Sequence, residues 1–254
     1  MIVKTEAIVL KRINYGDTSR IVSLLTKDYG RLSVIAKGAR SPRSRLGPVL
    51  DTLNHLQVVL YRKEGKDLHL LSQCDLLSRF TRLTDDLHRL GCALSVLDLV
   101  SASSHYDEDS TILFGTALES LNAMDSGPDP YSVLLYFQTR LLCILGFQPD
   151  FSCCTGCKAV VGLSGTKNGV FRLTADGILC PTCKPAHSTW LGITQEALSA
   201  LRMFQGMSFG WQCDRDSVSG ETYQEARTVL LHLLRTHVDR VRTMKSGSVL
   251  ASIV

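Results

Sequence analysis

Residues 20–36, RIVSLLTKDYGRLSVIA, decide the fold of the first third of this 254-residue chain. Hydrophobic and polar residues alternate in its two halves, residues 20–26 and 31–36, and many of the hydrophobic ones are β-branched. Between the halves stand Asp28, Tyr29 and Gly30, a combination typical of a tight turn. The stretch therefore predicts two short strands joined by a turn.

The same pattern continues on both sides of this pair. Residues 5–10, 53–61 and 68–77 read as further strands, and turn signals lie at residues 14–17 and 63–66. Five short strands in about 80 residues suit a small barrel, which closes its sheet and leaves no exposed edge. We therefore predict an OB-fold β-barrel at the N-terminus.

Beyond Asp85 the hydrophobic residues follow a helical period. The residues that carry it are Leu87, Leu90, Leu94, Leu97, Tyr131, Leu134, Leu135, Gln138, Leu141, Leu142 and Leu145. Glycine and proline at residues 126–130 and 146–150 should end helices. Helical patterning returns at residues 194–204, with Thr194 as the expected N-cap, and at residues 221–241.

The aperiodic stretch between these helices is rich in cysteine and glycine and reads as an insertion. The predicted fold class is a multidomain α+β protein with an OB-fold β-barrel, an all-α helical domain and an inserted zinc-ribbon-like module. The predicted boundaries are residues 1–80 for the barrel, 81–150 and 188–245 for the helical domain, 151–187 for the module and 246–254 for a flexible tail.

Composition narrows the class of protein. No apolar run is long enough to cross a bilayer, and Glu6, Lys11 and Arg12 do not fit a secretion signal. We therefore expect a cytoplasmic protein. In that compartment, nine cysteines indicate metal ligands or buried thiols rather than disulfides.

Two Cys-x-x-Cys pairs lie in the inserted module, and they are Cys154 with Cys157 and Cys180 with Cys183. Two residues between thiolates form a knuckle that points both sulfurs at one metal, and two knuckles complete a tetrahedral shell. The spacing predicts one structural Zn²⁺ with no open position for catalysis. Glycines at positions 156 and 177 suit the tight backbone of such knuckles.

Other readings of the cysteines stay open. The pairs can be unrelated thiols or a redox pair, Cys153 competes with Cys154 for the first ligand position, and His187 is an alternative fourth ligand. The isolated cysteines are expected to be small core residues. They are Cys74, Cys92, Cys143 and Cys213.

Positive charge is concentrated in the predicted barrel. Residues 1–82 hold 15 Lys and Arg against 7 Asp and Glu, whereas the rest of the chain is net negative. The densest basic run follows the third strand and has no acidic residue, which suits a row of phosphates. The proposed DNA-binding residues are Lys37, Arg40, Arg43 and Arg45 in this run, with Lys11, Arg12, Arg20 and Arg31 on the strands.

Three tyrosines of the barrel, Tyr15, Tyr29 and Tyr61, are candidate stacking platforms for unpaired bases. The competing interpretation is a solvated loop with tyrosines that belong to the core. The chain has no phosphate-binding loop, dinucleotide-binding, nucleophile-elbow or zinc-protease motif, so we expect no enzyme activity. The acidic clusters at residues 85–86 and 107–109 read as a helix start and a polar loop.

Several short motifs, in this order and spacing, resemble the bacterial RecO family of DNA-repair proteins. They are YGD at 15–17, DYGRLS at 28–33, KGAR at 37–40, SR at 44–45, LGFQP at 145–149 and GILC at 177–180. The doubled cysteine at 153–154 and the residues 175–177 depart from the family pattern, which leaves the first ligand's register open.

The resemblance implies an OB-fold, a helical domain and a zinc module. It also implies binding of single- and double-stranded DNA, annealing of complementary strands, and cooperation with RecR to load RecA onto strands coated by single-strand-binding protein. In some members the acidic tail of that coating protein docks on the helical domain. The alternatives are an RNA- or transcription-associated zinc-ribbon adaptor, a metal-dependent nuclease and a redox protein.

Overall fold

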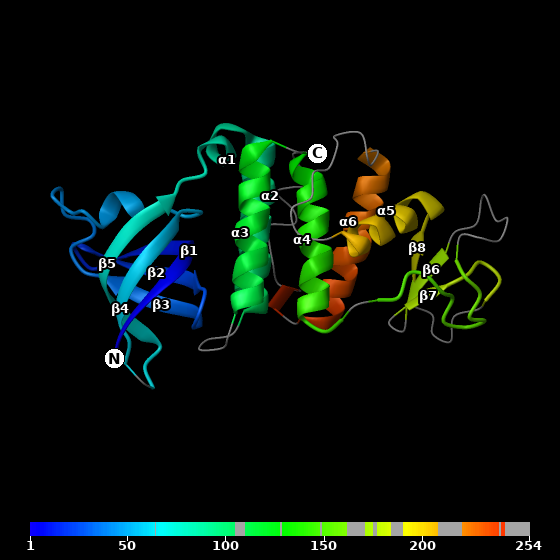
Figure 1. Cartoon of the computed structure of the whole chain (residues 1–254), viewed down its shortest axis with the longest axis horizontal. Coiled ribbons are helices and arrows are strands. Elements are labelled where there is room, and N and C mark those ends of the chain that lie inside the picture. The colour runs from blue at the N-terminus through cyan, green and yellow to red at the C-terminus, as the bar shows by residue number, and fades with distance from the viewer. Residues whose placement is uncertain are drawn as a thin grey trace. The chain divides into compact units, whose positions relative to one another are not determined.

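The computed structural model divides into two compact units, Met1–Ser126 and Gly127–Thr243 (Figure 1). None of the helices it describes combines the length and apolar character needed to span a membrane. The residues described are 1–63, 65–104, 110–127, 129–147, 149–161, 171–174, 177–183, 190–207, 220–238 and 240–241.

The first unit begins with a closed five-stranded barrel, as predicted. Its strands are β1 (Ile2–Tyr15), β2 (Ser19–Thr26), β3 (Gly30–Ala36), β4 (His55–Tyr61) and β5 (Leu68–Ser78). They follow the order β1-β2-β3-β5-β4, and β1 closes the barrel by pairing with both β2 and β4. Only β3 and β5 are parallel. This order is that of a five-stranded Greek-key barrel of the OB type.

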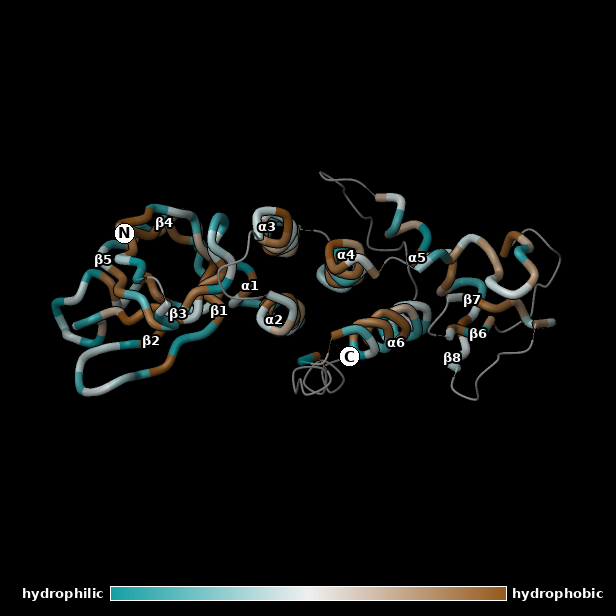
Figure 2. Tube along the Cα trace, turned by 90° about the horizontal axis from the view of Figure 1, so that it is seen from below, coloured by the Kyte–Doolittle hydropathy of each residue, from teal (hydrophilic) through white to brown (hydrophobic). Residues whose placement is uncertain are grey.

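Alternate residues of the strands fill the barrel, so hydrophobic and hydrophilic residues alternate along its tube in Figure 2. Ala39 and Leu50, from the segment between β3 and β4, join this core. The segment that carries the predicted basic loop is therefore anchored on the barrel. The core residues are Val3, Ala7, Val9, Val22, Leu24, Leu32, Val34, Ala36, Ala39, Leu50, Leu56, Val58, Leu60 and Leu71.

Three helices complete the first unit, namely α1 (Thr81–Asp85), α2 (Leu87–Ser103) and α3 (Thr111–Ser126). Asp86 caps α2 by accepting a hydrogen bond from the His88 N–H at 2.8 Å, in line with the helix start predicted there. Hydrogen bonds also tie the helices to the barrel, and one runs from the Ser110 hydroxyl to the Thr26 carbonyl at 2.7 Å.

The helical spacing predicted for α2 does not mark its buried face. Leu87 is 62% exposed and Leu94 is 39% exposed, whereas Cys92, Val96 and Val100 are fully buried. The reason is that α2 packs against α1, α3 and β1. A helix with neighbours on several sides has no single apolar stripe.

The second unit holds α4 (Pro130–Ile144), α5 (Gln195–Gly206) and α6 (Gly220–His237). Thr194 is the N-cap of α5 as predicted, because its hydroxyl accepts a hydrogen bond from the Ala197 N–H at 3.3 Å. A small sheet lies in the predicted module, with the order β7-β6-β8. Its strands, β6 (Phe171–Thr174), β7 (Gly177–Leu179) and β8 (Leu191–Ile193), are too short to show a period-two pattern.

Candidate nucleic-acid interface and metal centre

The basic loop after β3 lies beside the turn that joins β1 to β2. The Arg40 N–H donates to the Thr18 carbonyl at 2.8 Å, and Arg40 Nη1 donates to the Gly16 carbonyl at 2.9 Å. Lys37, Arg43 and Arg45 are exposed, as is Arg40. The loop and the turn therefore lie side by side on the barrel, and the exposed cations of the loop stand next to the turn.

The far end of this loop is held by side chains. Arg20 Nη1 donates to the Gly47 carbonyl at 2.9 Å, and Arg79 Nη2 donates to the Pro48 carbonyl at 3.0 Å. The Ser44 hydroxyl accepts the N–H of Gly47 at 3.2 Å. The loop ends in a 3₁₀ turn, η1 (Gly47–Val49). Sequence reasoning missed Arg79, because its partner lies 31 residues away and no local pattern signals the contact.

The predicted cations fall into two groups. Arg31 donates to the Ser101 carbonyl of α2, Arg20 holds the loop, and Arg12 forms an ion pair with Asp51 at 2.6 Å. Of the remaining five, Arg40 is held by the turn between β1 and β2. Within the part of the chain that the structure describes, the side chains of the other four make no hydrogen bond or ion pair, so their charges are free for a ligand. The free set is Lys11, Lys37, Arg43 and Arg45.

The three tyrosines also differ in their surroundings. Tyr15 is 54% exposed and precedes the Gly16 that binds Arg40, and Tyr61 is 43% exposed. Tyr29 packs against the barrel core, and the Arg62 guanidinium lies 5.1 Å from the centre of its ring. Tyr15 is therefore the tyrosine best placed to stack a base beside the loop.

Gly47→Ala should distort the basic loop without changing its charge. A Cβ atom there would lie 2.3 Å from the Ala39 carbonyl oxygen. We expect unfolding in denaturant to show a loss of about 1–3 kcal/mol, as for an overpacked site, and single-stranded DNA affinity to fall by roughly three- to tenfold. Gly115→Ala in α3 is the control, because its Cβ meets no atom within 4 Å. Unchanged affinity in the Gly47 variant would mean that loop geometry does not matter.

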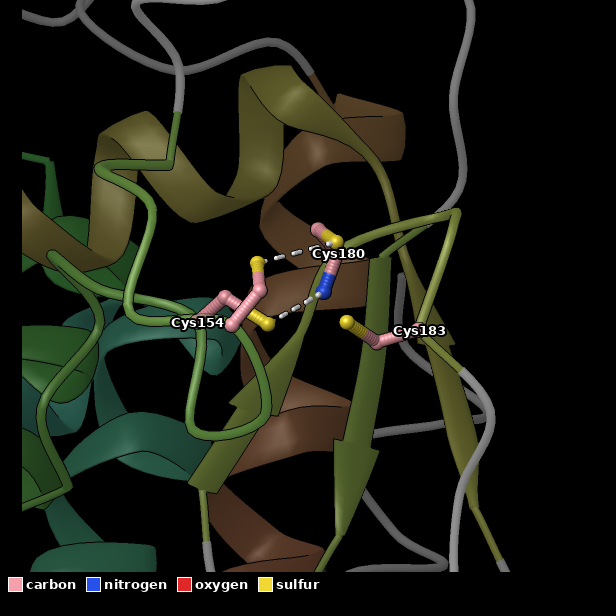
Figure 3. Close-up of side chains that lie close together, drawn as sticks. Cys154, Cys180 and Cys183 are labelled. Carbon is pink, nitrogen blue, oxygen red and sulfur yellow. Dashed lines mark hydrogen bonds between the residues drawn. The ribbon is translucent and has the colours of Figure 1, made fainter.

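The metal centre gathers the four predicted cysteines. The sulfur atoms of Cys154, Cys157, Cys180 and Cys183 all lie within 4.8 Å of one another, and those of Cys157 and Cys180 are 3.8 Å apart. Cys154 faces Cys180 and Cys183, which follow β7 (Figure 3). A tetrahedral metal with bonds of about 2.3 Å to sulfur separates the sulfurs by about 3.8 Å. The donor set thus fits one metal ion.

Backbone contacts shape the two knuckles. The Cys180 N–H donates to Cys154 Sγ at 3.3 Å, and the Thr155 N–H donates to the Ile178 carbonyl at 2.8 Å, which joins the knuckles. A Cβ on Gly156 would lie 3.2 Å from Cys183 Sγ, a tight contact that would push on the ligand sulfur. Gly177 has a φ of +123°, a conformation that favours glycine, as its predicted role requires.

The thiols influence one another's ionisation. The Thr182 hydroxyl, 2.9 Å from Cys180 Sγ, lowers the pKa of Cys180 to about 6. Hydrogen bonding to Cys180 and to the other two thiols raises the pKa of Cys183 to about 12. Four thiolates this close repel one another, so full ionisation requires a cation among them.

Cys153 is not among the four gathered sulfurs. It pairs with Val160 in an isolated β-bridge, and its sulfur accepts a hydrogen bond from the Ser152 hydroxyl at 3.8 Å. His187 and Cys213 lie outside the described residues. Cys92 is buried and Cys143 is half-buried, while burial raises the pKa of the half-buried Cys74 to about 11.

Two family models match this chain. A family model described as "Recombination protein O N terminal" matches residues 1–80, and one described as "Recombination protein O C terminal" matches residues 84–246. The chain belongs to the RecO family of DNA-repair proteins. All the RecO motifs noted in the sequence lie within these two matches.

Curated relatives named "DNA repair protein RecO" match most of this chain. "DNA repair protein RecO" of Roseiflexus sp. (strain RS-1) is 30% identical over 259 residues, covering 98% of this chain and 89% of the relative. The protein of that name from Bacillus subtilis (strain 168) is 28% identical, covering 91% and 87%. The protein from Symbiobacterium thermophilum is 31% identical, covering 78% and 77%. The RecO likeness thus extends over both units.

Proposed function

We propose that this RecO-family chain binds DNA through its barrel and acts as a recombination mediator. The observation that carries the proposal is the anchored basic loop, where the side chains of Lys37, Arg43 and Arg45 are exposed and make no hydrogen bond or ion pair with any residue that the structure describes. The exposed Tyr15 lies next to the turn that this loop contacts. Free cations neutralise backbone phosphates, and an exposed aromatic ring stacks an unpaired base. Such binding depends little on the base sequence of the DNA, which suits a protein that acts on any strand.

The mediator role follows from this chemistry together with the family. A basic surface that accepts phosphates of two strands reduces their repulsion, so complementary strands anneal faster. We further propose RecR, the tail of single-strand-binding protein and, functionally, RecA as partners in the cytoplasm. These partners rest on the RecO resemblance. No covalent step is needed, so we propose no enzyme activity.

The metal is proposed to be one structural Zn²⁺, held by Cys154, Cys157, Cys180 and Cys183. Four thiolates close the coordination shell, so the ion supplies folding energy to the second unit and no activated water.

DNA binding should depend steeply on salt. Each phosphate contact with a single strand contributes about 0.7 to the slope of log affinity against log salt, so four free cations predict a slope of about −3. Fluorescence anisotropy with a labelled oligonucleotide between about 50 and 200 mM salt measures it. An affinity that does not change with salt would contradict the phosphate-contact model. A clear preference for folded RNA over single-stranded DNA would favour the adaptor alternative.

A further inference from the structure

The two knuckles of the metal centre are each held from outside by an arginine. Arg202 on α5 reaches the hairpin that carries Cys154 and Cys157, and Arg172 on β6 reaches the turn that carries Cys180 and Cys183. Neither arginine touches a sulfur in any contact found among the described residues. Both bind the backbone that carries the ligands.

Arg202 joins both arms of the first hairpin. Its Nε donates to the Phe151 carbonyl at 2.9 Å on one arm, and its Nη2 donates to the Val161 carbonyl at 2.8 Å on the other. Between these points the arms pair through the Cys154 N–H and the Ala159 carbonyl at 2.9 Å. The planar guanidinium therefore closes the base of the hairpin, a task for which the single ammonium of lysine lacks the geometry.

Arg172 binds the backbone of the second knuckle through a single nitrogen. Its Nη1 donates to the carbonyls of Pro181 and Cys183, both at 3.1 Å, and its guanidinium lies 5.3 Å from the centre of the Trp190 ring. The carbonyl of Cys183 belongs to a ligand residue itself. The aromatic face restrains the orientation of the guanidinium, which in turn restrains the turn.

We propose that Arg172 and Arg202 are positioning residues of the metal centre, which hold the two knuckles in the metal-binding geometry and so set the affinity for zinc. The proposal rests on the zinc site proposed above. Two cations beside the knuckles also offset the net negative charge of one divalent ion bound by four thiolates. Because Arg202 lies on α5, whose cap Thr194 is bound by Glu225 of α6 at 2.8 Å, zinc binding is coupled to the helices of the second unit.

The test is zinc affinity of the full chain, measured by competition with a chromophoric chelator. Loss of a group that orients metal ligands typically costs about 10- to 100-fold in affinity. We expect that loss for Arg202→Lys, which keeps the charge and removes the fork, and for Arg172→Met, which removes both hydrogen bonds to the second knuckle. Gln205→Ala is the matched control, since it removes a 2.9 Å bond from the same helix to the Pro149 carbonyl, outside the hairpin.

Cobalt substitution distinguishes a variant that binds metal more weakly from one that no longer forms the site, because tetrahedral cobalt bound by thiolates has a distinctive absorption spectrum. Variants with that spectrum at saturation but weaker zinc binding support the proposal. Zinc affinity within about threefold of the unmodified chain overturns it. A variant that never gives the spectrum also overturns it, because the arginine is then required for folding of the module. Absence of zinc from the unmodified chain would instead defeat the zinc site itself.

Discussion

Cys154→Ser or Cys180→Ser is expected to empty the metal centre and to unfold the module around it. A structural zinc contributes roughly 10–16 kcal/mol of apparent binding free energy, so one of four thiolates accounts for about 2.5–4 kcal/mol, or roughly a hundredfold to a thousandfold in affinity. Both sulfurs belong to the gathered group, and serine does not replace a thiolate as a zinc ligand. Metal analysis after dialysis should fall from one zinc per chain to nearly none.

The neighbouring cysteine supplies the control for this prediction. Cys153→Ser changes the adjacent thiol, which lies outside the group of four sulfurs, and should leave the zinc content unchanged. Limited proteolysis should then cleave residues 151–183 faster in the Cys154 variant than in the Cys153 variant. If the Cys153 variant loses zinc and the Cys154 variant keeps it, the assigned register is wrong.

Replacing Lys37, Arg40, Arg43 and Arg45 together by alanine should nearly abolish DNA binding. The variant removes three of the four free cations together with Arg40, which corresponds to about two orders of magnitude in single-strand affinity near 0.1 M salt, and the salt slope should fall from about −3 to about −1. Strand annealing should fall in parallel, because the same surface neutralises both strands. Anisotropy and annealing of labelled oligonucleotides measure the two effects.

A variant with the same net charge tests whether charge is the cause. Lys37→Arg, Arg43→Lys and Arg45→Lys together keep four cations and should bind within a few-fold of the unmodified chain. Arg40 is left unchanged in this control because it also holds the Gly16 carbonyl. Alanine variants that remain folded and still anneal at the original rate would place the DNA elsewhere on the protein.

Much of the fold is predictable because its signals are local. Alternating hydrophobic residues and the turn at Gly30, with its φ of +63°, indicate β2 and β3 within 17 residues, and Thr194 marks the start of α5. The short strands β6, β7 and β8 escaped prediction because they are too brief for a period. The leucine spacing correctly predicts the helix α2, but it does not give the buried face, because burial there depends on several neighbours and leaves Leu87 and Leu94 exposed.

The sequence by itself determined the barrel, the helix caps, the two cysteine pairs and the basic run, since each depends on residues a few positions apart. The tertiary structure decided which cations remain free. Arg20 and Arg31 are held by carbonyls 27 and 70 residues away. It also brought Arg202 to a hairpin some 50 residues earlier and gathered Cys154 rather than Cys153. Such contacts exist only after the chain closes on itself, so no local spacing encodes them.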